Sequence, residues 1–237
     1  MEKEELRARL QDFAEPEYRE FSKKLLPGVR DILGVRIPHL RKIARQAAKG
    51  AWRDLLENIE DSRSMEETMV YGMILGYAKD IEWDEFLARI VHFLTEIDNW
   101  SVCDSVCCTL KKVKEDREGF WKFVTPYLSS EKEFEVRFAA VMVLNFYIDK
   151  EWVERTIDAL VTLHPDGYYA KMGVAWALSI CWISFPEETK KRVKREEMDQ
   201  EIYEKMIQKV MESTRTTREE KEYLRARRKA EKDGKLQ

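Results

Sequence analysis

The sequence predicts an all-α protein, for three reasons: it has few helix breakers, many helix-forming residues and a nearly continuous helical periodicity. Only 9 glycines and 6 prolines interrupt 237 residues, and the chain is rich in Glu, Lys, Arg, Leu and Ala. These residues favour helices. Apolar residues recur at intervals of three and four along most of the chain, whereas no segment alternates with period two for long enough to predict a strand.

Fourteen helices are expected, joined by short connections that favour antiparallel neighbours. In chain order they cover residues 3–13, 16–25, 38–49, 51–58, 64–79, 83–96, 99–114, 117–128, 133–148, 151–162, 168–184, 187–194, 198–212 and 216–231. Helix pairs recur about every 30–40 residues without an ankyrin or tetratricopeptide motif, which favours HEAT-like repeats. We therefore expect an α-solenoid, a curved superhelix whose concave face is lined by the second helix of each pair. No linker divides the chain, so residues 1–237 are predicted to form one domain, with a charged helix or tail from about residue 216.

The negative net charge argues weakly against a nucleic-acid partner, but the distribution of charge along the chain is compatible with one. The whole chain carries −3, whereas from Lys190 onward 16 Lys and Arg face 11 Asp and Glu. A basic surface can therefore coexist with an acidic outer face.

The chain shows no targeting, membrane or cofactor motif. Its charged first residues resemble neither a signal nor a transit peptide, and no apolar run reaches the roughly 18 residues of a membrane span. We expect a cytoplasmic protein that needs no cofactor or metal, because no His or Cys has metal-ligand spacing and no phosphate-binding loop is present. Three of the four cysteines, Cys103, Cys107 and Cys108, share one expected helix, so reduced core thiols are predicted.

The first candidate site follows a capping residue, Asp98 or Asn99. Trp100 and Asp104 are spaced i and i+4 and share a helix face, on which Lys111 is expected seven residues further along. A carboxylate beside an indole attracts positive charge through Coulomb attraction and the ring face. An ordinary acidic residue beside a core tryptophan is the alternative interpretation.

A second candidate is Arg137, the one charged residue between Val136 and Ile148. A guanidinium on an apolar face needs an anion. That anion is either a DNA phosphate or a buried carboxylate, for which Asp104 is a candidate.

The segment 168–178 is the third candidate. Trp176 is either a site residue or plain core packing. Tyr168, Tyr169 and Lys171 are expected to contact phosphates, as such side chains commonly do in DNA complexes.

A basic cluster lies in a turn followed by a helix at residues 34–45. Pro38 suits the first helical turn. Arg36, Arg41 and Lys42, with Arg45 nearby, are expected to bind phosphate near that helix N-terminus. An ordinary solvated face is the alternative.

Taken in order, GVRIPHLRKIAR at 34–45, NWSVCDS at 99–105, VRFAAVMVL at 136–144 and YYAKMGVAWAL at 168–178 resemble the AlkD-like DNA alkylation-repair glycosylases, a HEAT-repeat family. The resemblance covers about residues 5–212. It implies a superhelical fold that cups duplex DNA. It also implies an enzyme that excises cationic N3- and N7-alkylated purines. It also implies that Asp104 is the catalytic aspartate, with Trp100, Arg137 and Trp176 around the lesion. Basic side chains, Lys111 and Lys171 among them, would hold the DNA backbone.

Two positions depart from the family pattern. Ser101 stands where members commonly carry an acidic residue after the first tryptophan, and Phe21 stands where a tyrosine can face the lesion. The leading hypothesis is a monomeric DNA glycosylase acting on alkylated double-stranded DNA. The alternatives are a non-catalytic DNA-structure binder on the same scaffold and, because of the overall acidity, a protein-binding HEAT scaffold.

Overall fold

The computed structural model describes residues 1–29, 31–58 and 64–232. This part of the chain contains fourteen α-helices and no strand, so the all-α prediction is confirmed. An isolated antiparallel bridge joins Ala14 to Val35. No helix among these residues is both long and apolar enough to cross a membrane.

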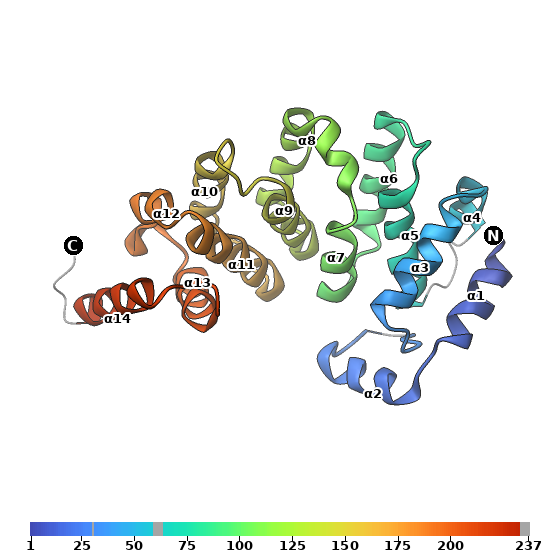
Figure 1. The fold of residues 1–237 in the computed structure, drawn as a ribbon, viewed down its shortest axis with the longest axis horizontal. Coiled ribbons are helices and arrows are strands. Elements are labelled where there is room, and N and C mark those ends of the chain that lie inside the picture. The colour runs from blue at the N-terminus through green and yellow to red at the C-terminus, as the bar shows by residue number, and fades with distance from the viewer. Residues whose placement is uncertain (30, 59–63, 233–237) are drawn as a thin grey trace. The chain divides into compact units, whose positions relative to one another are not determined.

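The chain divides into two compact units, Met1–Arg117 and Glu118–Gln237. Figure 1 shows the helices of each unit in chain order, from blue to red. The predicted single domain and the predicted solenoid with a concave face stay predictions.

The first unit is organised around one helix that is apolar on nearly every side. Its elements are α1 (Lys3–Asp12), α2 (Pro16–Leu25), α3 (Ile37–Ala47), α4 (Trp52–Asn58), α5 (Met65–Tyr77), α6 (Trp83–Thr95), α7 (Trp100–Cys107) and the 3-10 helix η1 (Lys111–Glu115). Every residue of α5 from Met65 to Leu75 is buried, and α3, α6 and α7 pack against it. A helix that is buried all round belongs at the centre of a core.

Two adjacent glutamates fix the start of α5 and the loop before α3. Ser64 and Glu67 form a reciprocal capping box. Glu66 is completely buried and accepts hydrogen bonds from the backbone N–H groups of Gly34, at 2.8 Å, and of its two neighbours. Gly34 has φ +91°, and a Cβ there would lie 2.6 Å from the Glu15 carbonyl oxygen, so only glycine fits this turn.

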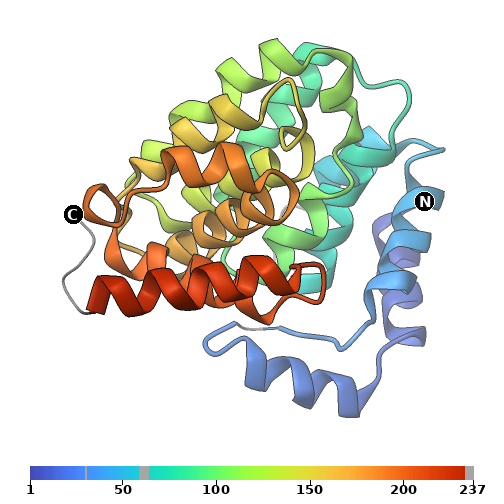
Figure 2. The same cartoon turned by 60° about the vertical axis from the view of Figure 1, so that its left-hand side comes forward.

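The second unit is built on two packed helices, α9 and α11. Its elements are α8 (Arg117–Val124), η2 (Thr125–Ser129), α9 (Glu133–Phe146), α10 (Val153–Val161), α11 (Tyr168–Ser184), α12 (Pro186–Arg192), η3 (Arg195–Glu197), α13 (Gln200–Glu212) and α14 (Arg218–Lys232). α11 packs against α9 on one side and α13 on the other. Figure 2 shows α14, in red, lying beside α13 at the end of this unit.

Most helix boundaries agree with the expected ones to within two residues, but the helix expected at 99–114 is wrong. α7 ends at Cys107 because Thr109 closes it: the Thr109 Oγ1 and backbone N both donate to the Val106 carbonyl, at 2.7 and 2.8 Å. Local side-chain bonds of this kind compete with helix continuation. Lys111 begins the separate helix η1, so it does not continue the stripe of Trp100 and Asp104 as predicted.

The helix expected at 117–128 is also too long. α8 ends at Val124 and gives way to η2. Pro126 has no backbone N–H to donate to the preceding turn, so the α-helical ladder stops there.

Candidate functional site

The start of α7 places an indole and a carboxylate on one half-exposed face. Asn99 caps the helix by accepting from the Val102 N–H at 3.0 Å. Trp100 and Asp104 are both partly exposed. The Asp104 carboxylate is therefore neither sealed in the core nor fully in solvent.

The buried side chains of α7 anchor it to the core. Val102, Cys103, Val106 and Cys107 are all fully buried. Since Trp100 and Asp104 are one turn apart, this anchoring fixes their relative positions.

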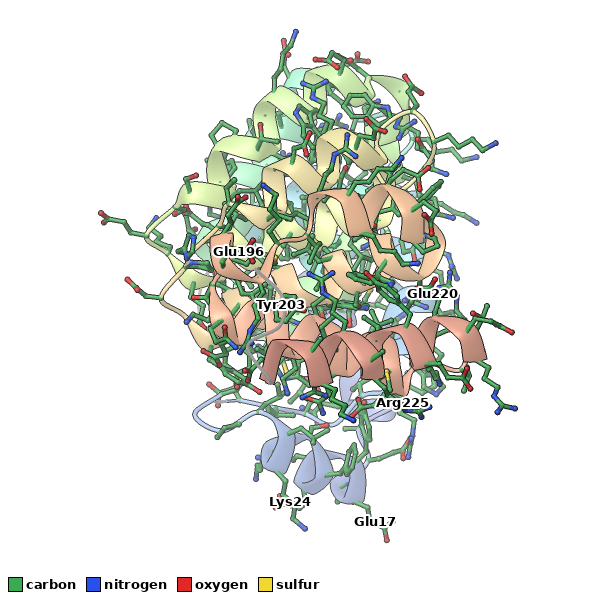
Figure 3. All side chains as sticks on the ribbon, turned by 90° about the vertical axis from the view of Figure 1, so that its left-hand side faces the viewer. Glu17, Lys24, Glu196, Tyr203, Glu220 and Arg225 are labelled. Carbon is green, nitrogen blue, oxygen red and sulfur yellow. The ribbon has the colours of Figure 1, made fainter. Side chains whose placement is uncertain are left out.

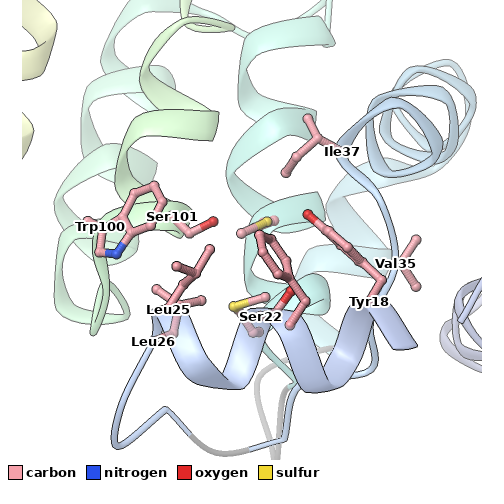
Figure 4. A pocket seen from close by; sticks show the side chains of 11 residues that line it. Tyr18, Ser22, Leu25, Leu26, Val35, Ile37, Trp100 and Ser101 are labelled. Carbon is pink, nitrogen blue, oxygen red and sulfur yellow. The ribbon is translucent and has the colours of Figure 1, made fainter. Parts of the chain in front are cut away.

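A small hollow of about 60 Å³ opens beside Trp100 and Ser101. Figure 4 shows these two residues beside Leu25 and Leu26 at the end of α2. Apart from its serines and one tyrosine hydroxyl, its lining is apolar: the side chains are Tyr18, Phe21, Ser22, Leu25, Leu26, Val35, Ile37, Met65, Met69, Trp100 and Ser101.

Two apolar side chains of α2 at this hollow are unusually exposed. Phe21 has 55% of its surface exposed and Leu25 has 47%. The family resemblance pointed to Phe21, whereas Leu25 was not predicted. The spacing of two apolar residues at i and i+4 in an otherwise charged helix is the pattern that would have found the pair.

In the second unit, Arg137 lies on α9 and is only 6% exposed. Its Nη1 donates to the Tyr169 carbonyl oxygen on α11 at 2.8 Å. α11 approaches closely because position 173 is glycine: a Cβ on Gly173 would come within 3.2 Å of the Arg137 Cγ. The buried guanidinium is therefore seated against one stripe of α11.

Tyr169, Gly173 and Trp176 are spaced i, i+4 and i+7, so they share that stripe. Trp176 is partly exposed rather than wholly buried in the core. Tyr169 stacks on Phe134 with ring centroids 5.6 Å apart, and Tyr168 is 57% exposed. The structure thus brings Arg137 and Tyr169 together on facing helices within one unit, and Trp176 lies on the same stripe of α11.

Other predicted DNA contacts already have partners. Lys171 forms ion pairs with Asp199, at 3.0 Å, and Glu201, at 3.2 Å, across the gap from α11 to α13. Arg36 pairs with Glu15 through two nitrogens and lies over the Tyr18 ring. This hydrogen bond is the main reason why the pKa of Glu15 is lowered.

The remaining basic residues differ in accessibility. Lys42 and Lys111 are exposed. Arg41 is half-buried; its Nη2 donates to the Cys108 Sγ at 3.3 Å, while its Nε is buried without a hydrogen-bond partner. Arg45 lies over the Tyr77 ring, 4.8 Å from the centroid.

The predicted site residues are shared between the two units. Trp100 and Asp104 belong to the first, and Arg137 and Trp176 belong to the second. Their joint action on one nucleotide stays a prediction. In the described residues, no group of three or more His, Cys, Asp or Glu side chains is placed to hold a metal ion. All four cysteines are free; Cys103, Cys107 and Cys181 are buried, whereas Cys108 is partly exposed rather than in the core.

A family model described as DNA alkylation repair enzyme matches residues 6–208. The chain belongs to this DNA alkylation repair family. The match spans most of both units, so it includes α7 and the facing helices α9 and α11. Membership gives this family member an enzymatic role in DNA alkylation repair and DNA as its partner. Neither a curated protein nor a solved structure matches the chain.

Proposed function

We propose that this family member is a DNA glycosylase that hydrolyses the N-glycosidic bond of cationic N3- and N7-alkylated purines in duplex DNA. One observation carries the proposal: α7 holds Trp100 and Asp104 one turn apart on a partly exposed face, in a chain of a DNA alkylation repair family. We further propose that the protein acts as a cytoplasmic monomer without a cofactor.

Asp104 has the central chemical role in this proposal. An alkylated purine is already positively charged, so it leaves without needing a general acid. What the reaction lacks is stabilisation of the oxocarbenium-like sugar and an oriented water molecule. A single carboxylate can supply both, as it does in sugar hydrolysis.

The aromatic side chains hold the sugar in place. Trp100 is fixed by the cap of α7, and its ring also borders the apolar hollow. The faces of Trp100 and Trp176 attract the developing cation. This attraction strengthens as charge develops, so it favours the transition state over the substrate.

Arg137 supplies positive charge for the phosphate next to the lesion. Its hydrogen bond to the Tyr169 carbonyl keeps the guanidinium in one orientation. Exposed Lys42, Lys111 and Tyr168 are the candidates for further backbone contacts, which carry little sequence preference. Arg36, Arg41 and Lys171 would have to exchange the partners described above to join them.

The experiment is release of 7-methylguanine from methylated duplex DNA, followed by chromatography of the freed bases. Asp104→Asn should lower the single-turnover excision rate by at least about 100-fold, the usual cost of removing a preorganised electrostatic group. Binding of DNA should be retained. Asp54→Asn, an exposed carboxylate on α4 in the same unit, is the matched control and should excise normally. Full excision by Asp104→Asn would refute the catalytic role.

A second candidate function is a DNA-structure binder that performs no excision. It is favoured by the neutral Ser101 hydroxyl, which lines the hollow, and by Phe21, which brings no hydroxyl to it. A protein that binds duplex, flapped or branched DNA but releases no alkylated base would establish this function instead.

A further inference from the structure

The C-terminal helix α14 (Arg218–Lys232) lies beyond the residues 6–208 that match the family, and it has two distinct faces. Glu220, Leu224 and Arg227 are spaced i, i+4 and i+7 and form the docked face. Lys221, Arg225, Arg228 and Lys229 are spaced i, i+4, i+7 and i+8 and form a second stripe beside the docked face, the outer face of α14. The sequence alone left this segment open as a charged helix or tail.

The docked face holds α14 against the rest of its unit. Leu224 is completely buried. Glu220 accepts from the Trp182 Nε1 at 3.1 Å and pairs with the Lys190 Nζ at 2.6 Å. Arg227 donates to the Val193 carbonyl at 3.2 Å. These contacts make α14 an ordered part of the second unit.

The outer face presents cations, and Glu222, three residues before Arg225, already pairs with Arg218. Arg225, Arg228 and Lys229 are exposed, and within the described residues none of them makes a hydrogen bond or an ion pair. Figure 3 shows Arg225 on the lower side of α14 and Glu220 on its upper side.

Like charges three and four residues apart on a helix repel one another, so an external anion bound along the stripe would relieve this repulsion. Cations elsewhere on this protein commonly pair with nearby carboxylates, as Lys23 does with Glu20 and Arg155 with Glu118. On α14 itself, Arg218 pairs with Glu222 at 2.8 Å, at the edge of the stripe.

The spacing of the stripe suits a polymer of phosphates. From position 221 to position 229 a helix rises about 12 Å. Duplex DNA presents one phosphate per about 3.4 Å along each strand, so a rigid stripe of this length can meet several phosphates at once. A single small anion would meet only one or two of the cations.

We infer that the outer face of α14, formed by Lys221, Arg225, Arg228 and Lys229, is a contact surface for the phosphate backbone of duplex DNA. This inference rests on DNA as the partner in the proposed function. It adds a sequence-independent anchor that lies outside the family's matched core and takes no part in the chemistry.

The test compares binding of unmodified duplex DNA across a salt series for the wild type and the triple variant Arg225→Gln/Arg228→Gln/Lys229→Gln. Glutamine preserves helix propensity. Affinity for DNA falls as salt rises, and each lost phosphate contact makes the slope of log affinity against log salt shallower by about 1. The magnitude of this slope should therefore decrease by about 3 in the triple variant. Affinity at about 0.1 M salt should fall at least roughly tenfold.

Three exposed lysines elsewhere in the same unit provide the matched control. Lys122→Gln/Lys132→Gln/Lys150→Gln changes the net charge equally and should leave the slope unchanged. Arg225→Lys/Arg228→Lys keeps the charges and should retain the wild-type slope. An unchanged slope in the triple glutamine variant, an equal loss in the lysine control, or a lost slope in the Arg→Lys variant would each overturn the inference.

The measurement separates this inference from the proposed chemistry. Unmodified DNA contains no base to excise, so failure of the glycosylase assay would leave the salt slopes intact. Conversely, loss of the salt effect would leave single-turnover excision at saturating enzyme unchanged.

Discussion

A buried guanidinium is costly unless its donors are satisfied. The Arg137 guanidinium on α9 donates to the Tyr169 carbonyl, and Gly173 on α11 leaves room for the arginine side chain. Both partners are more than 30 residues away in the sequence. The sequence could therefore predict that this charge needs a partner, but the alternatives it left open did not include a backbone carbonyl.

The Gly173→Ala variant tests whether the position of the Arg137 side chain matters for activity. The added Cβ would lie 3.2 Å from the Arg137 Cγ, so the arginine side chain must shift. Alanine favours the helix by up to about 1 kcal/mol over glycine, which should offset the crowding and leave the thermal unfolding midpoint nearly unchanged. We expect single-turnover excision of 7-methylguanine to fall several-fold.

Gly50→Ala is the control, because a Cβ at that position meets no atom closer than 3.8 Å. It should excise at the wild-type rate. Normal excision by Gly173→Ala would show that the exact position of Arg137 is unimportant.

At the scale of elements, one lysine joins two helices of the second unit. The Lys171 ammonium on α11 meets Asp199, the N-cap of α13, and the ion pair is largely shielded from solvent. Burial alone would raise the pKa of Asp199. The Ile202 N–H and Lys171 more than offset this, so its pKa is lowered below 3.8. The hydrogen bond to Asp199 is the largest cause of the raised pKa of Lys171.

Replacing this lysine should weaken the unit in a pH-dependent way. Lys171→Met keeps the apolar stem but removes the charge, and should cost about 1 kcal/mol in the free energy of unfolding near pH 7. The wild-type advantage should shrink as the pH falls from about 3.8 through the lower pKa of folded Asp199. It should also shrink as the pH rises above about 10.5 through the raised pKa of Lys171.

Urea unfolding from pH 3 to pH 11 measures this difference. Glu201→Gln is the control: its carboxylate is 51% exposed, so its loss should change stability little. A pH-independent difference between wild type and Lys171→Met would assign the effect to packing instead.

Periodicity predicted most of the helices, because most of them bury a regular apolar face. It failed at the ends of α7 and α8. There, local chemistry decides: the hydroxyl of Thr109 bonds back to the helix, and Pro126 lacks an N–H. The helical spacing of apolar residues continues past both helix ends, so periodicity alone cannot locate them.

At the scale of the whole molecule, the residues proposed to act together come from both units. The family match extends across both. Spacing predicted the shared face of Trp100 and Asp104, since an i, i+4 pair on one helix depends only on local geometry. It could not predict that Lys171 and Arg36 have carboxylate partners, because those partners lie on other elements.

A double-mutant cycle tests whether Asp104 and Arg137 act together in excision, and it does not depend on the distance between them. If Asp104 and Arg137 serve one transition state, the loss of excision in Asp104→Asn/Arg137→Gln should be smaller than the product of the two single losses. Single-turnover rates of the four proteins measure this. Multiplicative losses would show that the two residues act independently.

The four free thiols of the chain bear on how the protein survives the conditions in which it would work. Thiolates, rather than thiols, react with methylating electrophiles. Burial raises the pKa of the Cys181 thiol to about 12 and that of Cys107 well above its ordinary value. Cys103 is also buried, and only Cys108 is partly accessible. Methylating agents that damage DNA therefore meet few reactive thiolates on this protein, and Cys108 is the cysteine most open to them.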